Sequence, residues 1–426
     1  MSEYGGAAIG GHRVVVMAPE TTPGIDSAGP GQMMRRTSAD FALVGSAITS
    51  DEIRPSNQVA NFWLGPRSIK GQIAGDLSAG SCTMLFEGLL RSPFTAGTTL
   101  TPLPGATLTQ DLGLSILAVP GQDLVAAGFR GGDIVRLNGV GGDASADNAI
   151  DFITTTAFAT QLNLYNSAVV FAAGASPDIV AVVGAKCFMP ATGLQKFTYT
   201  IEDQFLDRDV VERFAGCVVD GLTITASASG IATFVATLTG QTMVQAVYPL
   251  YGVPAQITTS PPLMACGGVL MLNGERIGYI TSFALGIAAE TNADANCASN
   301  TLDTILQGRL RVTGSLSILM ISNDQMVSDM LAENTFQISL LLTDSTSPGA
   351  DFISIFLPVV KLLTGNTSDS ATAIVQTFTF QALEQTTDPT LDGSTIVIQD
   401  SLGPSTMAAP AGGWVFGVSG FGTGAF

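Results

Sequence analysis

The chain has 426 residues and a net charge of −18, and only 12% of its residues are charged, about half the usual ~25%. Its mean hydropathy is positive, at +0.39, yet no apolar run approaches the ~20 residues that a membrane helix needs. The acidic balance argues against phosphate binding, because nucleic-acid binders gather lysine and arginine into basic patches. So little charge favours burial in a large protein assembly; the alternative is a surface of serine, threonine, glycine and alanine.

The first 100 residues are predicted to form antiparallel strands and one short helix. Apolar and small or polar side chains alternate in residues 40–48 and again after residue 65, a pattern typical of half-buried strands. Residues 83–90 are predicted to be helical. The polar residues 50–61 are predicted to be either an arm that a neighbouring ring of copies covers or a plain surface loop.

Residues 101–190 are predicted to form a separate small β domain, inserted into a surface loop of the first one. Strands are expected within residues 131–139, 152–156 and 178–184, each bounded by turn residues. A domain inserted at a surface loop disturbs its host least, so we expect it to project outward. The strands suggest a compact barrel-like fold.

The remaining sequence returns to long alternating strands. Residues 222–226 and 378–380 show the two-residue period, and residues 324–333 have apolar side chains at helical spacing after Asn323, a cap-like start. Residues 401–426 carry no charged side chain and place Trp414 and three phenylalanines among small residues. We expect this arm to order by packing on a neighbouring subunit, unless it is a disordered end.

An internal repeat is the most informative feature. The pattern G-x-x-x-[I/V]-x-G occurs at Gly65 to Gly71 and again at Gly308 to Gly314. Each copy is followed by alternating apolar residues and then by a predicted helix. Residues 40–48 match 278–287 in character upstream, and residues 231–241 match 374–385 downstream. The preserved order favours a duplication over chance similarity among threonine-rich strands.

The repeat predicts the domain organisation. Residues 1–100 and 191–260 form a first, discontinuous β domain, and residues 261–400 form the second. Residues 101–190 are the inserted domain, and residues 401–426 form a C-terminal arm. The expected fold class is mostly β: two tandem β-sandwich domains, each with one flanking helix.

Residues that could support catalysis are scarce. His12 is the single histidine and lies in a glycine-rich terminal stretch, which is a poor place for the firmly oriented base of a catalytic triad. The five cysteines lack C-x-x-C spacing, so buried reduced thiols are favoured over disulfides or a metal site. Residues 143–154 resemble a calcium loop, but Asn148 and Thr154 stand where glycine and glutamate are needed. We expect no enzymatic activity, no cofactor and no metal.

The chain resembles the tail tube (major tail) proteins of siphophages. The resemblance rests on residues 20–24, 46–58, 65–78 and 212–224, and covers about residues 15–100 and 190–395. It implies a pair of packed antiparallel sheets per domain, with protomers joined sheet to sheet around an inner β-barrel wide enough for duplex DNA.

The resemblance also implies partners and place. We expect stacked rings of this chain, three copies each with pseudo-six-fold symmetry, because single-domain members of the family usually form six-membered rings. Further expected partners are tape measure and tail terminator proteins, and viral DNA that passes an acidic lumen without specific binding. The location would be the virion tail, assembled in the host cytoplasm without a membrane. The rival prediction is a β-rich surface-array or adhesion subunit; such a subunit normally carries an export signal, which the first residues do not show.

Overall fold

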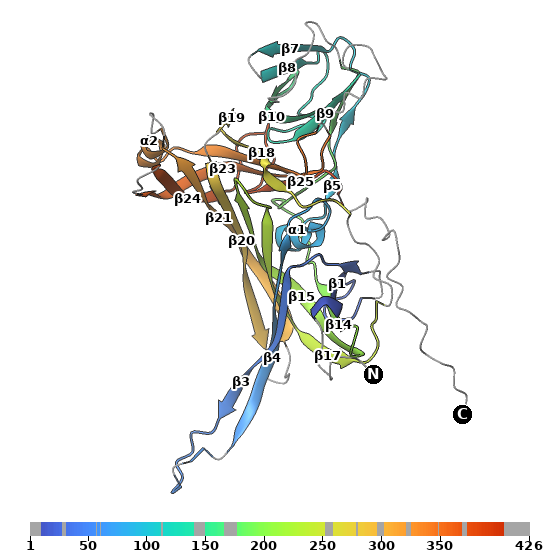
Figure 1. Ribbon diagram of the computed structural model, residues 1–426, viewed down its shortest axis with the longest axis vertical. Coiled ribbons are helices and arrows are strands. Elements are labelled where there is room, and N and C mark those ends of the chain that lie inside the picture. The colour runs from blue at the N-terminus through green and yellow to red at the C-terminus, as the bar shows by residue number, and fades with distance from the viewer. Residues whose placement is uncertain are drawn as a thin grey trace, which may run out of the picture.

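The computed structural model describes residues 10–27, 31–56, 58–59, 61–111, 114–139, 150–165, 177–251, 259–277, 280–295, 302–320, 325–347, 349–368 and 373–403. The molecule is mostly β and its strands pair antiparallel, as the sequence predicts. In Figure 1 it is elongated, with long strands joining a small sheet at one end to a projecting hairpin at the other.

Two α-helices lie in the described part of the chain. Helix α1 (Thr83–Leu90) has the predicted bounds, and α2 (Gln325–Leu331) lies within the predicted range. Asn323, the expected cap of α2, is outside the described residues. A short 3-10 turn, η1 (Gly10–His12), precedes the first strand.

The strands of the main body form two sets in the order of the chain; most of them are long, but β2 and β19 have two residues each. The first set is β1 (Arg13–Pro19), β2 (Gln32–Met33), β3 (Ser38–Thr49), β4 (Phe62–Asp76), β14 (Tyr199–Phe205), β15 (Val210–Ser227), β16 (Thr233–Gly240) and β17 (Thr242–Ala246). The second set is β18 (Met264–Leu272), β19 (Glu275–Arg276), β20 (Ile280–Ala295), β21 (Leu302–Leu319), β22 (Phe336–Thr343), β23 (Phe352–Ser368), β24 (Val375–Leu383) and β25 (Val397–Asp400).

A seven-stranded sheet stands at the upper end of Figure 1. Its strands pair in the order β6 (Thr99–Leu100), β12 (Ile179–Val182), β9 (Ile134–Asn138), β10 (Ile150–Phe158), β11 (Gln161–Tyr165), β8 (Leu114–Ala118) and β7 (Thr107–Asp111). Leu117, Leu137, Phe152 and Leu164 lie in a hydrophobic core of its own. Among the described residues no pairing joins β6 to β7, so the order is that of an open sheet rather than a closed barrel.

Two short strands connect this sheet to the rest. β5 (Thr95–Ala96) and β13 (Ala185–Phe188) pair with each other, and β13 also pairs with β25. Both connecting strands therefore join a sheet that contains β22, β23 and β25, from the second set of long strands.

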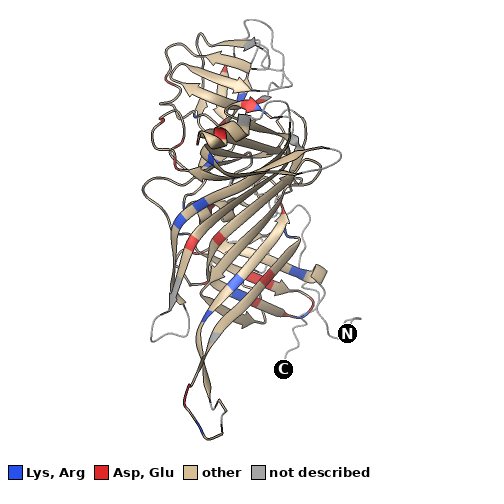
Figure 2. Cartoon of the chain, turned by 90° about the vertical axis from the view of Figure 1, so that its left-hand side faces the viewer, with Lys and Arg blue, Asp and Glu red and all other residues tan. Residues whose placement is uncertain are grey.

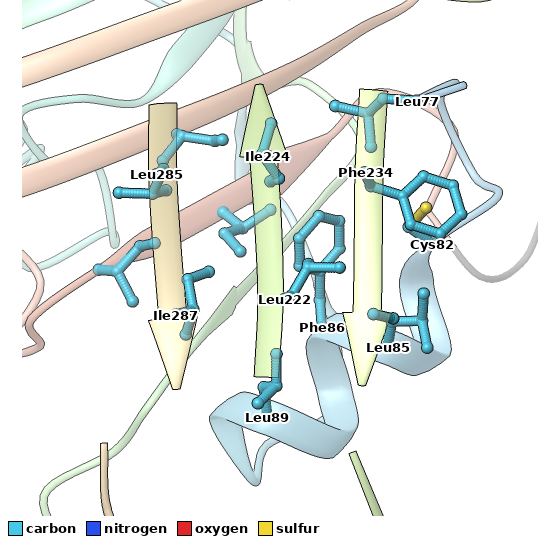
Figure 3. Packing of buried hydrophobic residues seen from close by; sticks show 14 of the residues in the cluster. Leu77, Cys82, Leu85, Phe86, Leu89, Leu222, Ile224, Phe234, Leu285 and Ile287 are labelled. Atoms are coloured by element: carbon cyan, nitrogen blue, oxygen red, sulfur yellow. The ribbon is translucent and has the colours of Figure 1, made fainter. Parts of the chain in front are cut away.

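The main core lies between the long sheet and the layer that holds α1. Figure 3 shows Leu85, Phe86 and Leu89 of α1 packed beside Leu222 and Ile224 of β15 and Leu285 and Ile287 of β20; all seven are essentially inaccessible to solvent. The helix thus covers the place where the two sets of strands meet. Burial of such side chains stabilises the fold by roughly 1.5–3 kcal/mol each.

The opposite face of the long sheet is bare. It faces the viewer in Figure 2, where few charged residues interrupt its strands. Side chains alternate in direction along a strand, so Thr223 and Thr225 point to this face while Leu222 and Ile224 point to the core. No helix in the described part of the chain is long and apolar enough to cross a membrane.

Candidate assembly interface

A single eight-stranded ladder runs through both sets of strands. Pairing follows the order β3, β4, β16, β15, β20, β21, β24, β23. At its centre, β15 of the first set pairs with β20 of the second, from Gly221 opposite Ala288 to Ser227 opposite Ser282. This pairing, together with the α1 side chains over it, is called the internal junction below.

The two sets of strands, inside and outside the ladder, repeat the same pairings. β1 pairs with β14, β14 with β15 and β15 with β16 in the first half; β18 pairs with β22, β22 with β23 and β23 with β24 in the second. Each half has a bulge at the corresponding place. In β15 the register shifts at Asp220, opposite Leu238, and in β23 it shifts at Leu363, opposite Phe380.

The bulges set a register between the halves that agrees with the glycine motif. Leu238 corresponds to Phe380 by bulge position, and their ladder partners are Gly71 and Gly314 respectively. The motif had matched those same two glycines from sequence alone. Two independent observations therefore equate β4 with β21 residue by residue.

This register corrects one sequence match. Gly71 pairs with Phe41, and Gly314 pairs with Leu285, so Phe41 corresponds to Leu285. Residues 40–48 therefore correspond to 284–292 and not to 278–287. A strand slides along its partner by an even number of residues without changing which face is apolar, so the pattern alone did not determine this alignment.

The four motif glycines all lie in strands, Gly65 and Gly71 in β4 and Gly308 and Gly314 in β21. A Cβ at Gly71 would collide with the ring of Phe41, and one at Gly314 with the ring of Phe380. A Cβ at Gly308 would lie 2.9 Å from the carbonyl oxygen of Glu290. The close approaches explain the glycines at positions 71, 308 and 314; a role beyond local packing stays a prediction.

The ladder ends in two open edges. β3 pairs only with β4, so its other edge, including the exposed Leu43 and Val44, has no strand beside it in the described structure. β23 pairs with β22 only as far as Val360, and residues 361–368 then pair with β24 on the other side alone. An unpaired edge of this length is a template for another strand.

The structure covers the internal junction with side chains from both halves. Arg91 follows α1 and donates to the carbonyl oxygens of Gln307 (3.1 Å) and Gly308 (2.9 Å). The Gln307 amide donates in turn to the carbonyl oxygens of Gly88 (3.1 Å) and Val219 (3.0 Å). At the corresponding place in α2, Leu331 is 78% exposed, whereas Leu89 of α1 is fully buried.

A protein-family model described as phage tail tube protein matches residues 10–382. The chain belongs to the phage tail tube protein family. It is therefore a structural tail tube component, belonging to the virion tail of a phage and assembling with copies of itself, in a family that is not normally enzymatic. A search of curated proteins finds no match.

The β3–β4 hairpin of this tail tube protein extends well beyond the rest of the molecule (Figure 1). Its tip carries Ile53, and Phe62, Trp63 and Leu64 follow at the start of β4; all four are exposed. Residues 50–61 join the strands, as the arm prediction requires. In the corresponding part of the second half, β20 and β21 stay paired from Thr291 opposite Gln307 to Ala295 opposite Leu302.

A buried ion cluster attaches the seven-stranded sheet to the tube part. The Lys186 ammonium lies 2.8 Å from Asp133 and 3.1 Å from Asp392, all three largely buried. Burial raises the pKa of Asp133, while the nearby ammonium opposes that rise. Beside it, the Gln399 amide accepts from the Ile134 N–H and donates to the carbonyl oxygens of Ile134 and Val183. Both carboxylates depend on the one ammonium, so loss of Lys186 would leave two largely buried charges without an opposite partner.

The described residues offer no arrangement for chemistry. His12 lies in the exposed turn η1. Cys82, Cys187 and Cys217 are buried free thiols, and burial raises the pKa of Cys82 to about 12, so they are poor nucleophiles and poor metal ligands. No metal-binding group of three or more His, Cys, Asp or Glu occurs in the described part of the chain. The calcium-like residues 143–147 and the arm after residue 403 are outside it.

Proposed function

We propose that this protein is the subunit of a long non-contractile siphophage tail tube, with three copies in each ring and rings stacked into a hollow conduit for the genome. One observation carries the proposal. The internal junction joins β15 to β20, and the counterparts of those two strands, β23 and β3, are the open edges at the two ends of the same ladder. Chains that join β23 to β3 would repeat the internal junction between copies.

The repeat fixes the expected pairing register. Thr364 corresponds to Gly221 by the bulge, and Val44 corresponds to Ala288 by the glycine motif. The internal pair Gly221–Ala288 thus predicts that Thr364 of one copy lies opposite Val44 of the next. The following pairs run antiparallel to Ser368 opposite Asp40. Leu331 of α2 would be buried at this junction, as Leu89 is at the internal one.

Barrel geometry favours three copies. Each chain contributes the eight strands of the ladder, so three copies make 24. Strands about 4.8 Å apart and tilted by about 40° then enclose roughly 45–50 Å between backbones. Two copies would give a barrel only about 30 Å across between backbones. The inward side chains narrow it further, which leaves little room for duplex DNA. Three copies with two repeats each also give the pseudo-six-fold ring.

The lumen we propose is the bare face of the long sheet. Thr223, Thr225, Thr377 and Thr379 lie on it, with other serines, threonines and alanines. Charged residues of both signs occur among its strands (Figure 2), and Lys70 and Arg311 pair with the carboxylates of Asp220 (3.8 Å) and Glu290 (3.3 Å). This replaces the expectation of a carboxylate-lined lumen. A neutral hydroxyl surface offers no lysine row for counterion release, so DNA passes without being held.

The remaining organisation follows the repeat. We propose two tandem tube domains, residues 1–100 with 191–260 and residues 261–400, and an outward domain at residues 101–190, supported by the separate core of the seven-stranded sheet. The exposed β3–β4 hairpin would dock on the next ring. Tape measure protein inside the tube and terminator protein at its end are the further partners, with assembly in the host cytoplasm.

Electron cryo-microscopy of assembled protein tests the conduit. Stacked rings of three chains around an open lumen are expected. Six chains per ring would contradict the stoichiometry, and a flat lattice would favour the surface-array alternative.

Cysteine pairs test the register. We expect the double variant Val44→Cys with Thr364→Cys to form disulfides between copies under mild oxidation. A covalent trimer should then be the largest cross-linked species on a denaturing gel. The matched control, Asp40→Cys with Thr364→Cys, places the sulfurs four residues out of register and is expected to stay largely monomeric. Wild-type protein under the same oxidant gives the background of the native thiols. Equal cross-linking of both pairs would contradict the register.

A further inference from the structure

The edge of strand β17 that faces away from β15 has no strand beside it in the described structure. β17 pairs with β15 on one side, from Val211 opposite Ala246 to Ala215 opposite Thr242. In the described structure, the residue-level pairing found for β17 is with β15 alone. Val244, Val247, Tyr248 and Leu250 at and after β17 are all exposed. β17 therefore combines unpaired backbone groups with apolar side chains in solvent, which a soluble protein usually avoids.

The counterpart of β17 in the second half is covered. β25 pairs with β23 as β17 pairs with β15, and the register equates Val397 with Val244. Val397 is 4% exposed and Val244 is 54% exposed. The difference arises because β13 pairs with the outer edge of β25, and β5 pairs with β13.

The cover over β25 comes from the other repeat. β5 and β13 both lie between α1 and β14, so they belong to the first half, yet they extend the sheet of the second. Between α2, which ends at Leu331, and β22, which begins at Phe336, the chain is too short to supply the same cover. Across a junction between copies, the edge of β17 would stay open unless another segment of the preceding copy covers it.

We propose that residues 414–418 of one copy add as a strand to the bare edge of β17 in the next copy of the ring. This stretch, Trp-Val-Phe-Gly-Val, is rich in residues that favour strands. It is as long as β17, which has five residues. Trp414, Phe416 and Val418 share one face of such a strand and supply the apolar cover that Val244 and Tyr248 lack.

The chain reaches far enough. The described structure ends at Gly403, shortly after β25. Residues 403 to 414 span up to about 36–40 Å when extended. The four ladder strands of one repeat are only about 19 Å wide, so the next repeat in the ring lies within reach. Residues 401–426 are uncharged, so the added strand desolvates no ionised side chain.

This inference rests on the proposed ring, and hydrogen exchange tests the two separately. We expect those amides of residues 242–246 that do not donate to β15 to exchange at least 100-fold more slowly in assembled tubes than in the unassembled chain. Trp414→Ser with Phe416→Ser is expected to remove that protection while the amides of β20 keep theirs. The matched control is Leu114→Ser with Ile116→Ser, which removes exposed apolar side chains from β8 instead and should leave residues 242–246 protected.

The alternatives give different results. Protection, in the unassembled chain, of the β17 amides that do not donate to β15 would mean that each copy covers its own β17, and would overturn the proposal. Protection that survives in a variant ending at Gly403 would mean another occupant. Tubes with fast exchange at 242–246 would refute this inference alone, whereas a chain that forms no rings at all would also refute the proposed function. Restored protection when a peptide of residues 404–426 is added to tubes of the truncated chain would support it.

Discussion

The two halves of the molecule contain the same elements, but each half exposes one element whose counterpart in the other half is covered. Leu89 of α1 is buried over the internal junction, whereas Leu331, at the same place in α2, is 78% exposed. β25 is covered by β13, whereas β17 is bare. In each pair the covered member faces a neighbour within the chain, and in the ring that we propose the exposed member faces the next copy. The exposed apolar surface thus marks missing neighbours and not poor packing.

The largest expected effect on assembly comes from a substitution at the exposed Leu331 of helix α2. Leu331→Asp should leave the fold of the unassembled chain intact, with a thermal midpoint within about 2 °C, because the side chain is in solvent. It should abolish ring assembly, since it would bury an unpaired carboxylate between copies. Leu114→Asp, on the exposed face of β8, is the matched control and should assemble normally. Normal assembly of Leu331→Asp would break the comparison between the helices.

A smaller effect, on the stability of the unassembled chain, is expected at Lys186 in β13, the strand that covers β25. Lys186→Met removes the ammonium shared by Asp133 and Asp392 and leaves two largely buried carboxylates unpaired. We expect the free energy of unfolding of the unassembled chain to fall by about 4 kcal/mol in guanidinium titrations at pH 8. Lys361→Met, which breaks an exposed pair with Glu333, should change it by less than about 0.5 kcal/mol. An equal loss in both variants would contradict a special role for the buried cluster.

The smallest expected effect is a pH dependence at the end of β25. Asp400 accepts the N–H groups of Gly80 (2.7 Å) and Leu402 (3.0 Å), and burial raises its pKa to about 6. A raised carboxyl pKa means that the protonated form suits the fold. Its stabilising contribution is therefore present below about pH 4 and is lost as the pH rises through about 6. Between pH 5 and pH 8 this loss is roughly 1 kcal/mol.

Asp400→Asn removes this titration. The variant should be less stable at every pH, because an amide cannot accept both N–H groups equally well. The difference in its unfolding free energy between pH 5 and pH 8 should nevertheless shrink by roughly 1 kcal/mol, measured by guanidinium unfolding at both values. An unchanged pH difference would mean that Asp400 is not the titrating group. Other carboxyls whose pKa burial raises, including Asp133, Glu87 and Asp220, contribute to the slope that remains.

Much of the local structure follows from local patterns. The two-residue period predicts the strands, and α1 occurs at the predicted residues because its apolar spacing is helical. The motif at Gly71 and Gly314 identifies equivalent positions because a Cβ there collides with an aromatic ring. The assembly interface was less predictable. Exposed residues such as Leu43, Val244 and Leu331 look like ordinary core residues in sequence, since apolar spacing does not say which neighbour buries a side chain.

By itself, the sequence determined the mostly β class, the repeated order of elements and the equivalence of the glycines, because each of these rests on spacing within a few residues. Only the tertiary structure decided the alignment of residues 40–48 with 284–292, the pairing of β15 with β20 and the crossing of β13 onto β25. These are pairings between residues far apart in the chain. Their register is set by bulges and by the burial of whole faces, which no local pattern specifies.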